Sequence, residues 1–271
     1  AVTSIQTGNV NYLAGSNIAQ NANTTTQAGQ IDYVATAGNL TIKESIRTTT
    51  GAGDINFTAG DSIRSEIIGT GEGDINFTAA NNIVASNTVD TASGEVNFTA
   101  TTGSIETEAD AAITATSNIS LAAQGNIDQN AAVASTAQGD VTYSAATGSI
   151  TQNAETTANT GDIAYTAAQN ITQNAVTSIQ TGNVNYLAGS NITQNADTTV
   201  QTGNVNYLAG SNIAQNAKDI ATNTSRIETI EATYVKDITQ NGNSLTITQG
   251  TTKTTFTFTD ENTTNADISN T

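Results

Sequence analysis

The sequence of 271 residues contains no cysteine, methionine, proline, tryptophan or histidine. Without histidine and cysteine, most transition-metal sites and most pairs of a nucleophile with a base have no residues to form them. The absence of cysteine also excludes disulfides, so other interactions must stabilise the fold. No apolar run approaches the length of a membrane-spanning helix, and we therefore expect no membrane insertion of this segment.

Positive charge is scarce as well. Asp and Glu together number 24 and Lys and Arg only 7, which gives a formal net charge of −17, and no Lys or Arg lies between Ser65 and Ala217. This balance argues against nucleic-acid binding, because phosphate would be repelled. We recognise no signal peptide, and Ala1 stands in the middle of a repeat, so we interpret the sequence as a mature piece or an excised fragment. The polar composition by itself would suggest disorder, but the periodicity indicates order.

The residues VTSIQTGNVNYLAGSNI occupy positions 2–18 and return unchanged at 176–192. Segments equivalent to the one that begins at Gly8 recur at intervals of 20 to 24 residues, which defines ten coils. The other segments begin at Gly29, Gly53, Gly73, Gly94, Ser117, Gly139, Gly161, Gly182 and Gly203. Self-similarity at a fixed period is the signature of a stacked repeat architecture.

Apolar and polar residues alternate after each of these starting positions. The second residue is always Val or Ile, the fourth is Tyr, Phe or Leu, and the sixth is Ala, as in Ile75, Phe77 and Ala79. The residues between them are mostly polar, such as Asn76 and Thr78. Strict alternation of this kind predicts a half-buried strand.

A second strand is expected ten or eleven residues after each starting position, with one aliphatic residue of each coil pointing inward. These residues are Ile18, Leu40, Ile63, Ile83, Ile105, Ile127, Ile150, Ile171, Ile192 and Ile213. The rest of each coil varies in length and carries Ala, Val and Thr, which suggests a shorter third side with loops. The sequence thus predicts an all-β fold over residues 1–217, a parallel β-helix of about ten coils of some 21 residues. The handedness of parallel crossovers favours the right-handed form.

Stacked strands lie about 4.8 Å apart, so ten coils would give a rod of about 50 Å. Residues 180–196 and 201–217 differ only at Thr193 and Ala214, which indicates recent lengthening of the array by duplication. Coils that stack on near-copies of themselves are compatible with such growth.

The runs GNVNYLAGSNIAQNA and GDIAYTAAQNITQNA resemble the β-helical repeats of filamentous haemagglutinin-type adhesins, which Gram-negative bacteria secrete. The resemblance covers residues 2–217 approximately. It implies an extracellular or cell-surface rod that acts in adhesion, biofilm formation or contact-dependent delivery, with a host or bacterial surface protein or a glycan as partner. The secretion domain of that family has no counterpart in this sequence, so the export route stays open.

The pattern changes at Lys218. Ile220, Ile227 and Tyr234 are seven residues apart, and Asn223 and Ile230 follow the first two by three residues. This spacing predicts a short helix over 218–235. Its apolar seam would either join copies of the chain as a coiled coil or fold back as a cap on the last coil of the same chain. The run IATNT at 220–224 resembles the stalk motif of trimeric autotransporter adhesins, which implies that Asn223 would hold an anion between three helices. Residues 261–271 are expected to form a flexible tail.

Residues 236–260 are expected to form a β-hairpin that turns at Gly250. In this hairpin, Leu245 and Ile247 would lie opposite Phe256 and Phe258.

Acidic residues follow the starting position in several coils. Asp54, Asp74 and Glu95 do so in three successive coils, and Asp140 and Asp162 in two more. Stacking would bring neighbouring carboxylates to about 5 Å, where they repel by roughly 1 kcal/mol per pair even in water. One interpretation is a site for a hard cation, Ca²⁺ in particular, formed by the first three. The other is a solvated turn whose side chains splay apart. We expect no other cofactor.

Outward-facing apolar residues are a further candidate for contacts. Leu13, Val34, Leu187 and Leu208 would form apolar patches on the rod, unless loops cover them.

We therefore predict a non-enzymatic bacterial adhesin or surface-fibre segment. One alternative is a segment of a trimeric autotransporter or phage tail fibre that assembles through 218–235. The other is a carbohydrate-active β-helix enzyme, which would need a carboxylate pair that the repeat does not set apart from its ordinary positions.

Overall fold

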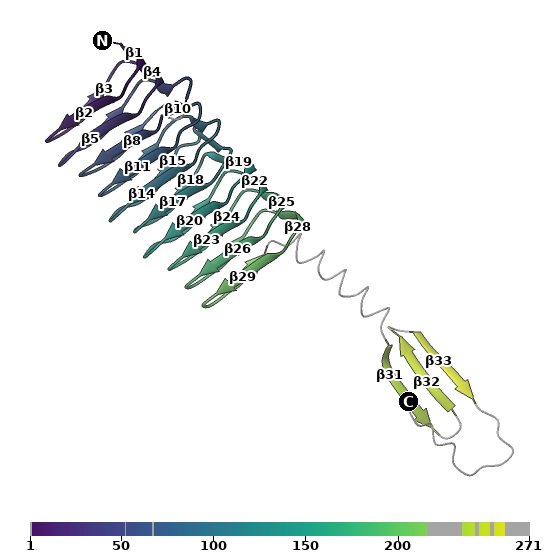
Figure 1. Cartoon of the computed structure of the whole chain (residues 1–271). Helices are drawn as coiled ribbons and strands as arrows, with labels where there is room; N and C mark the ends of the chain where they lie inside the picture. Colours follow the sequence, from purple (N-terminus) through teal and green to yellow (C-terminus); the bar gives the residue numbers. More distant parts are fainter. Residues whose placement is uncertain are drawn as a thin grey trace. The chain divides into compact units, whose positions relative to one another are not determined.

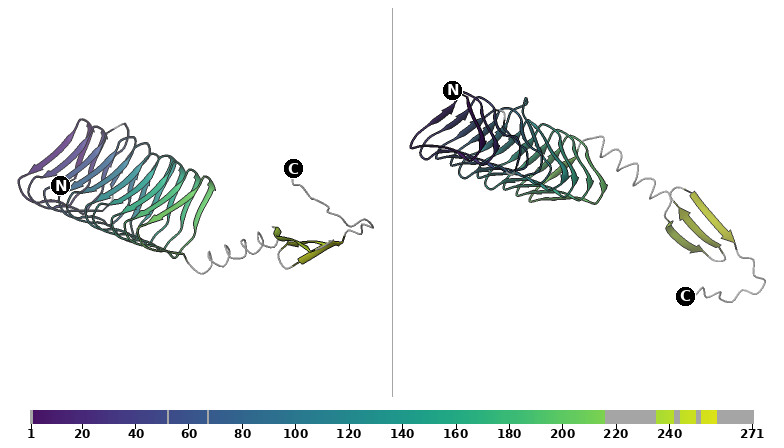
Figure 2. Two further views of the ribbon diagram at one scale, coloured as in Figure 1. Left: turned by 90° about the horizontal axis from the view of Figure 1, so that it is seen from below. Right: turned by 45° about the horizontal axis from the view of Figure 1, so that its top comes forward.

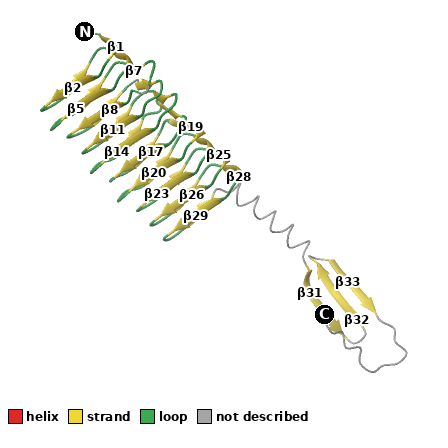
Figure 3. Cartoon of the chain, in the orientation of Figure 1, coloured by secondary structure: helices red, strands yellow, loops and turns green. Residues whose placement is uncertain are grey.

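The computed structural model describes residues 2–51, 53–66, 68–215, 235–241, 244–249 and 252–257. All regular secondary structure in these ranges is β-strand, as Figure 3 shows. The chain divides into two compact units, Ala1–Gln215 and Asn216–Thr271. No helix within the described ranges is long and apolar enough to cross a membrane.

The first unit is a parallel β-solenoid of ten coils, which confirms the predicted architecture (Figure 1). Three parallel sheets of ten strands each form its three sides, and each coil contributes one strand to every sheet. Figure 2 shows from two further directions that equivalent strands of successive coils lie side by side.

The first sheet consists of β1 (Thr3–Thr7), β4 (Thr24–Ala28), β7 (Ile46–Thr48), β10 (Ile68–Thr70), β13 (Val89–Thr91), β16 (Ala112–Ala115), β19 (Ala132–Gln138), β22 (Thr156–Thr160), β25 (Thr177–Thr181) and β28 (Thr198–Thr202). The second sheet consists of β2 (Val10–Ala14), β5 (Ile31–Ala35), β8 (Ile55–Ala59), β11 (Ile75–Ala79), β14 (Val96–Ala100), β17 (Ile119–Ala123), β20 (Val141–Ala145), β23 (Ile163–Ala167), β26 (Val184–Ala188) and β29 (Val205–Ala209). The third sheet consists of β3 (Ile18–Gln20), β6 (Leu40–Ile42), β9 (Ile63–Ser65), β12 (Ile83–Ala85), β15 (Ile105–Thr107), β18 (Ile127–Gln129), β21 (Ile150–Gln152), β24 (Ile171–Gln173), β27 (Ile192–Gln194) and β30 (Ile213–Gln215).

The second sheet follows the alternation of the sequence. In β11, Ile75, Phe77 and Ala79 are buried, whereas Thr78 is exposed. Each of these residues pairs with its own equivalent in the neighbouring coils, as in Phe77 with Phe98. The rings of these two residues stack with their centroids 4.6 Å apart. The inner face of the second sheet is therefore a set of ladders that run through the coils, each made of one residue type or of close relatives.

The side of variable length, expected to be short with loops, is a continuous sheet of ten strands. Strands and the segments between them both absorb its variation in length: β7 has 3 residues and is separated from β8 by residues 49–54, whereas β19 has 7 residues. The register between β19 and β22 shifts between Ser135 and Gln138, where the extra residues of β19 are accommodated.

Burial declines at the two end coils. Ile213, which the sequence places in the core, is 47% exposed, because β30 is the last strand of its sheet and no described coil covers it. Ile18 of the first coil is half-buried for the same reason. Ile192, one coil before Ile213, is buried.

Glycine at the start of a coil has a steric cause. Gly182 has a φ of +140°, a region that side chains rarely adopt, and a Cβ atom there would lie 1.6 Å from the carbonyl oxygen of Gly161. Glycine therefore lets consecutive turns stack at this corner.

In the second unit, β31 (Val235–Asn241), β32 (Ser244–Gln249) and β33 (Thr252–Thr257) form a three-stranded antiparallel sheet. The predicted hairpin is thus extended by β31, which begins at Val235, a residue that the sequence analysis assigned to the helix. Leu245 lies opposite Phe256 as expected, whereas Ile247 pairs with Thr254 and not with Phe258. Antiparallel register runs in opposite directions along the two strands, so a residue further along one strand meets an earlier residue of the other. Residues 218–234 of the expected helix, Phe258 and the tail lie outside the described residues.

We predict that Ile75→Asp destabilises the solenoid far more than Asn76→Asp. The first change buries an unpaired carboxylate between two coils and should cost several kcal/mol. The second keeps the oxygen that accepts a hydrogen bond from Asn97 Nδ2 and loses only the donation to Asn56 Oδ1, which should cost about 1 kcal/mol. Thermal unfolding followed by circular dichroism measures both, and equal losses would contradict the inward and outward assignment.

Candidate functional site

The acidic column lies at the corner that leads into the second sheet. Asp54 Oδ1 accepts a hydrogen bond from the backbone N–H of Asp74 at 2.9 Å, and Asp74 Oδ1 accepts one from the N–H of Glu95 at 2.9 Å. Glu95 Oε1 accepts a bond from Asn118 Nδ2 at 2.8 Å. Each carboxylate therefore binds the coil that follows it.

Other polar residues at the same position bind the next coil in the same way. The backbone N–H of Asp140 donates to Asn118 Oδ1 at 2.8 Å, that of Asp162 to Asp140 Oδ1 at 2.7 Å, and that of Asn183 to Asp162 Oδ1 at 2.7 Å. Asn and Asp serve this purpose equally, because only a side-chain oxygen is needed. The column thus has a structural role that does not require its charge.

The structure gathers no group of three or more acidic side chains that would suit a metal ion, within the residues that it describes. The calcium site formed by Asp54, Asp74 and Glu95 stays a prediction of the sequence. One oxygen of Asp54 and one of Asp74 are engaged by backbone N–H groups, so a cation would share them or take the other oxygen of each. Ile220, Asn223, Ile227, Ile230 and Tyr234, the predicted oligomerisation residues, lie outside the described residues.

The predicted apolar patches lie on the outer face of the second sheet. Leu187 and Leu208 are register partners in adjacent coils and are 44% and 66% exposed. At the opposite end of the sheet, Leu13 is 76% exposed and pairs with Val34. Between these two patches the same column carries Thr, Ala and Ser. The outer apolar surface therefore concentrates at the two ends of the solenoid.

A buried polar network inside the later coils was missed by the sequence analysis. Gln173 is fully buried, and its Nε2 donates to the backbone oxygens of Ala175 at 3.0 Å and Asp197 at 3.1 Å. Its Oε1 accepts from the hydroxyls of Tyr186 and Thr198, each at 3.1 Å. Burying a polar amide is tolerated only when its hydrogen bonds are made, and here both ends of the amide are used.

The same three residue types recur around this network. The residues equivalent to Gln173 that are also buried are Gln20, Gln129, Gln152 and Gln194. The hydroxyls of Tyr143 and Tyr165 bond those of Thr156 and Thr177, at 3.0 and 3.2 Å. In the third to fifth coils, by contrast, Phe replaces Tyr, and Ile or Val replaces Thr. This joint change of Tyr with Thr and Gln was the signal in the sequence that pointed to the network.

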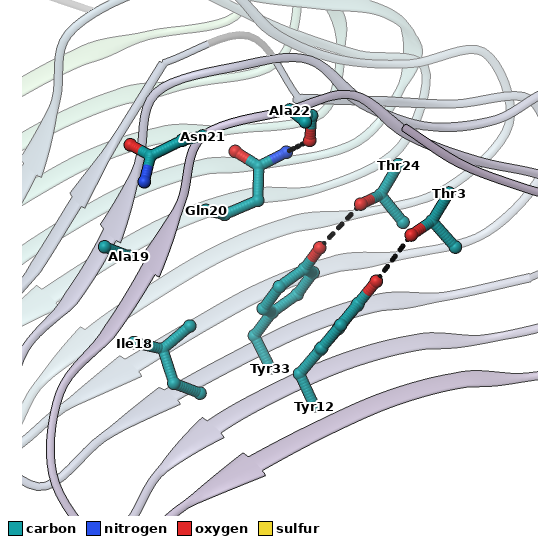
Figure 4. Close-up of a pocket in the computed structure, with 9 residues that line it drawn as sticks. All are labelled: Thr3, Tyr12, Ile18, Ala19, Gln20, Asn21, Ala22, Thr24 and Tyr33. Carbon is teal, nitrogen blue, oxygen red and sulfur yellow. Dashed lines mark hydrogen bonds between the residues drawn. The ribbon is translucent and has the colours of Figure 1, made fainter. Parts of the chain in front are cut away.

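An end cavity of about 280 Å³ opens beside the first coil. Figure 4 shows Tyr12 and Tyr33 side by side in it, with their hydroxyls bonded to Thr3 and Thr24, each at 2.7 Å. The amide of Gln20 lies across from them and bonds the carbonyl oxygen of Ala22. The lining has the same Tyr, Thr and Gln composition as the buried network.

Burial affects the tyrosines of this network. It raises the pKa of Tyr33 to about 12 from the usual value of 10. It also raises the pKa of Tyr165 well above the usual value of 10. The hydroxyls are therefore neutral at physiological pH and act as hydrogen-bond donors and acceptors.

The fold defines this chain as a parallel β-solenoid repeat protein. Comparison with family models, with curated proteins and with solved structures finds no match in any of the three.

We predict that Asp74→Asn leaves the stability within about 1 kcal/mol of the parent chain, because Asn keeps the oxygen that accepts the N–H of Glu95 and removes a like charge. Asp74→Ala removes the acceptor and should cost about 1 to 2 kcal/mol. Urea unfolding at neutral pH measures both changes. A loss of similar size in both variants would contradict the structural role of this oxygen.

The calcium hypothesis predicts that millimolar calcium raises the unfolding temperature, because a ligand bound only by the native state stabilises it by mass action. Replacing Asp54, Asp74 and Glu95 together with Asn should abolish this gain. A shift no larger than that given by monovalent salt at equal ionic strength would refute the calcium site.

We predict a fall in stability above pH 10. The pKa of Tyr33 is raised in the folded state, so between pH 10 and about 12 the unfolded chain loses a proton that the native chain keeps. The free energy of unfolding is therefore unaffected by this group below pH 10 and decreases as pH rises through that window. The double variant Tyr143→Phe/Tyr165→Phe should lose about 1 kcal/mol per hydrogen bond at pH 7 but show a smaller alkaline decrease. Parallel pH curves for the two chains would contradict this account.

Proposed function

We propose that this chain is a non-enzymatic, extracellular rod segment of a bacterial adhesin or surface fibre. The observation that carries the proposal is the continuous filling of the solenoid by ladders of buried side chains from the second to the ninth coil. A chain built in this way resists bending and holds whatever is attached to its ends at a fixed separation, about 50 Å for ten strands at their usual spacing. The proposal includes that the solenoid is right-handed and that its repeats are related to those of filamentous haemagglutinin-type adhesins.

Surface chemistry supports a role in contact with water and with polar partners. Asn56, Asn76 and Asn97 form a side-chain ladder on the outer face of the second sheet, with hydrogen bonds of 2.9 and 3.0 Å. Exposed Thr58, Thr78 and Thr99 run beside it. Amides and hydroxyls at regular spacing suit hydrogen bonding to a glycan or a protein surface. The surplus of acidic residues favours solubility of a long fibre.

The two alternatives rest on other residues. Assembly into a trimeric fibre would use the predicted seam from Ile220 to Tyr234, and a mass measurement of the full chain tests it. A carbohydrate-active enzyme would require a pair of carboxylates that acts on sugar, and release of reducing ends from bacterial and host polysaccharides tests that alternative.

We predict that cells displaying the full chain on their surface adhere several-fold more strongly to bacterial or host cells than cells displaying the bare anchor. The triple variant Thr58→Lys/Thr78→Lys/Thr99→Lys changes the polar face without touching the core and should reduce this adhesion. The matched control Leu187→Thr/Leu208→Thr removes an apolar patch elsewhere on the same sheet. Adhesion no greater than that of the bare anchor, together with sugar release, would refute the adhesin proposal and favour the enzyme.

A further inference from the structure

The two ends of the solenoid carry the same sequence. Residues 6–22 and 201–217 are identical at all 17 positions. The first segment belongs to the coil of β1, β2 and β3, which are the outermost strands at one end of the three sheets. The second belongs to the coil of β28, β29 and β30, the outermost strands at the other end. An open strand edge is a template for pairing with a further strand.

The contact between the ninth and tenth coils shows how such a sequence stacks. β26 and β29 pair in register, with Tyr186 beside Tyr207 and Leu187 beside Leu208. The rings of the two tyrosines are parallel within 4° at a centroid separation of 4.9 Å. The first coil presents the same residues as the tenth, Tyr12 and Leu13 among them.

We propose that the tenth coil of one copy of this chain stacks on the first coil of a second copy in that same register. Thr198 would then lie beside Thr3, Tyr207 beside Tyr12 and Ile213 beside Ile18. Each of these pairs repeats a pair of identical residue types found between the ninth and tenth coils. The contact does not depend on what the rod binds, and it goes beyond the proposed adhesion.

The end cavity supports this arrangement through its polar groups. Tyr207 donates to Gln194, which lies 13 residues earlier, and Thr198 donates to Gln173, which lies 25 residues earlier. Offsets of 13 residues from Tyr12 and of 25 residues from Thr24 lead to the same repeat position. It is the position of the glutamine in a coil that would precede the first one.

In the stacked arrangement that position belongs to Gln215 of the copy that contributes the tenth coil. Gln215 is equivalent to Gln20, and the coils that start at Gly8 and Gly29 are 21 residues apart. The position 21 residues before Gln20 is therefore the same one, and Gln215 would occupy it. The amide of Gln215 would therefore enter the end cavity of about 280 Å³ and accept from the hydroxyls of Tyr12 and Thr24. One glutamine would complete both hydrogen-bond patterns.

Charge and apolar surface support the same contact. The chain has a formal charge of −17, yet residues 2–22 and 198–217 contain no charged side chain, so the two ends do not repel each other locally. Stacking would also place exposed Leu208 beside exposed Leu13 and join the two apolar patches into one ladder. A head-to-tail contact of this kind does not close on itself and leads to a fibre.

Cysteine cross-linking tests the register. The chain has no cysteine of its own. In the double variant Leu13→Cys/Leu208→Cys, the two thiols of neighbouring copies would lie on adjacent strands about 4.8 Å apart, within the range that a disulfide spans. Mild oxidation of the full chain should give a ladder of multiples of 27.6 kDa in denaturing gels without reductant. Each single variant should give no species larger than a dimer.

The matched control is Leu13→Cys/Thr166→Cys. Thr166 occupies the same column as Leu208 but lies in the eighth coil, where β23 pairs with strands of its own chain on both sides. A ladder of equal extent in this control would overturn the proposed register. The variant Leu187→Cys/Leu208→Cys should close a disulfide within one chain and verifies that the thiols are reactive.

Sedimentation without cross-linking provides a second test. The N–H of Val10 donates to Gln30 in the second coil, so the N–H of the next residue, Asn11, is directed to the open edge. Asn11→Pro therefore blocks that edge with little cost to folding, and should abolish association at unchanged unfolding temperature. Asn11→Ser, which introduces the residue found at the equivalent Ser120, should still associate. A parent chain that stays monomeric at all concentrations would overturn the proposal.

Discussion

Hydrogen bonding between successive coils is the constraint on which the rest of the structure depends. Every strand of the solenoid pairs in parallel with its equivalents one coil away, so each side chain lies next to the residue at the same repeat position. A residue type that stacks well on itself is then favoured in every coil. The near-identity of coils is a consequence of this geometry, because a duplicated coil brings its own matching neighbour.

Two kinds of interior satisfy this constraint. In the third to fifth coils Phe57, Phe77 and Phe98 stack on one another, and the buried polar residues are small ones such as Ser65 and Thr70. In the seventh to ninth coils tyrosine hydroxyls reach the opposite side of the coil and bond threonine. Changing Phe to Tyr places a hydroxyl in the core, which requires a polar partner in the first sheet. The three sides of a coil therefore vary together.

The surface follows a different rule from the interior. Side chains at the corners of the coils bond backbone groups of the next coil, so that Asp54 and Asp74 contribute to stacking although they are charged and accessible. The outer face of the second sheet is polar in the middle and apolar at the ends. The hydrogen bonds at the corners stabilise the stacking of coils within one chain. The apolar ends would stabilise the stacking between chains in the arrangement that we propose.

The sequence by itself determined the number of coils, the strands of the second and third sheets and the inward columns, because strict alternation and a fixed period leave only one way to bury Ile75 and Phe77. It did not predict β31, since antiparallel pairing with β32 is a contact that no local pattern records. The partners of the acidic column and of Gln173 also emerged only from the tertiary structure. These bonds join residues about 13 to 25 positions apart, and they form only when the register between coils brings one oxygen within reach of a particular donor.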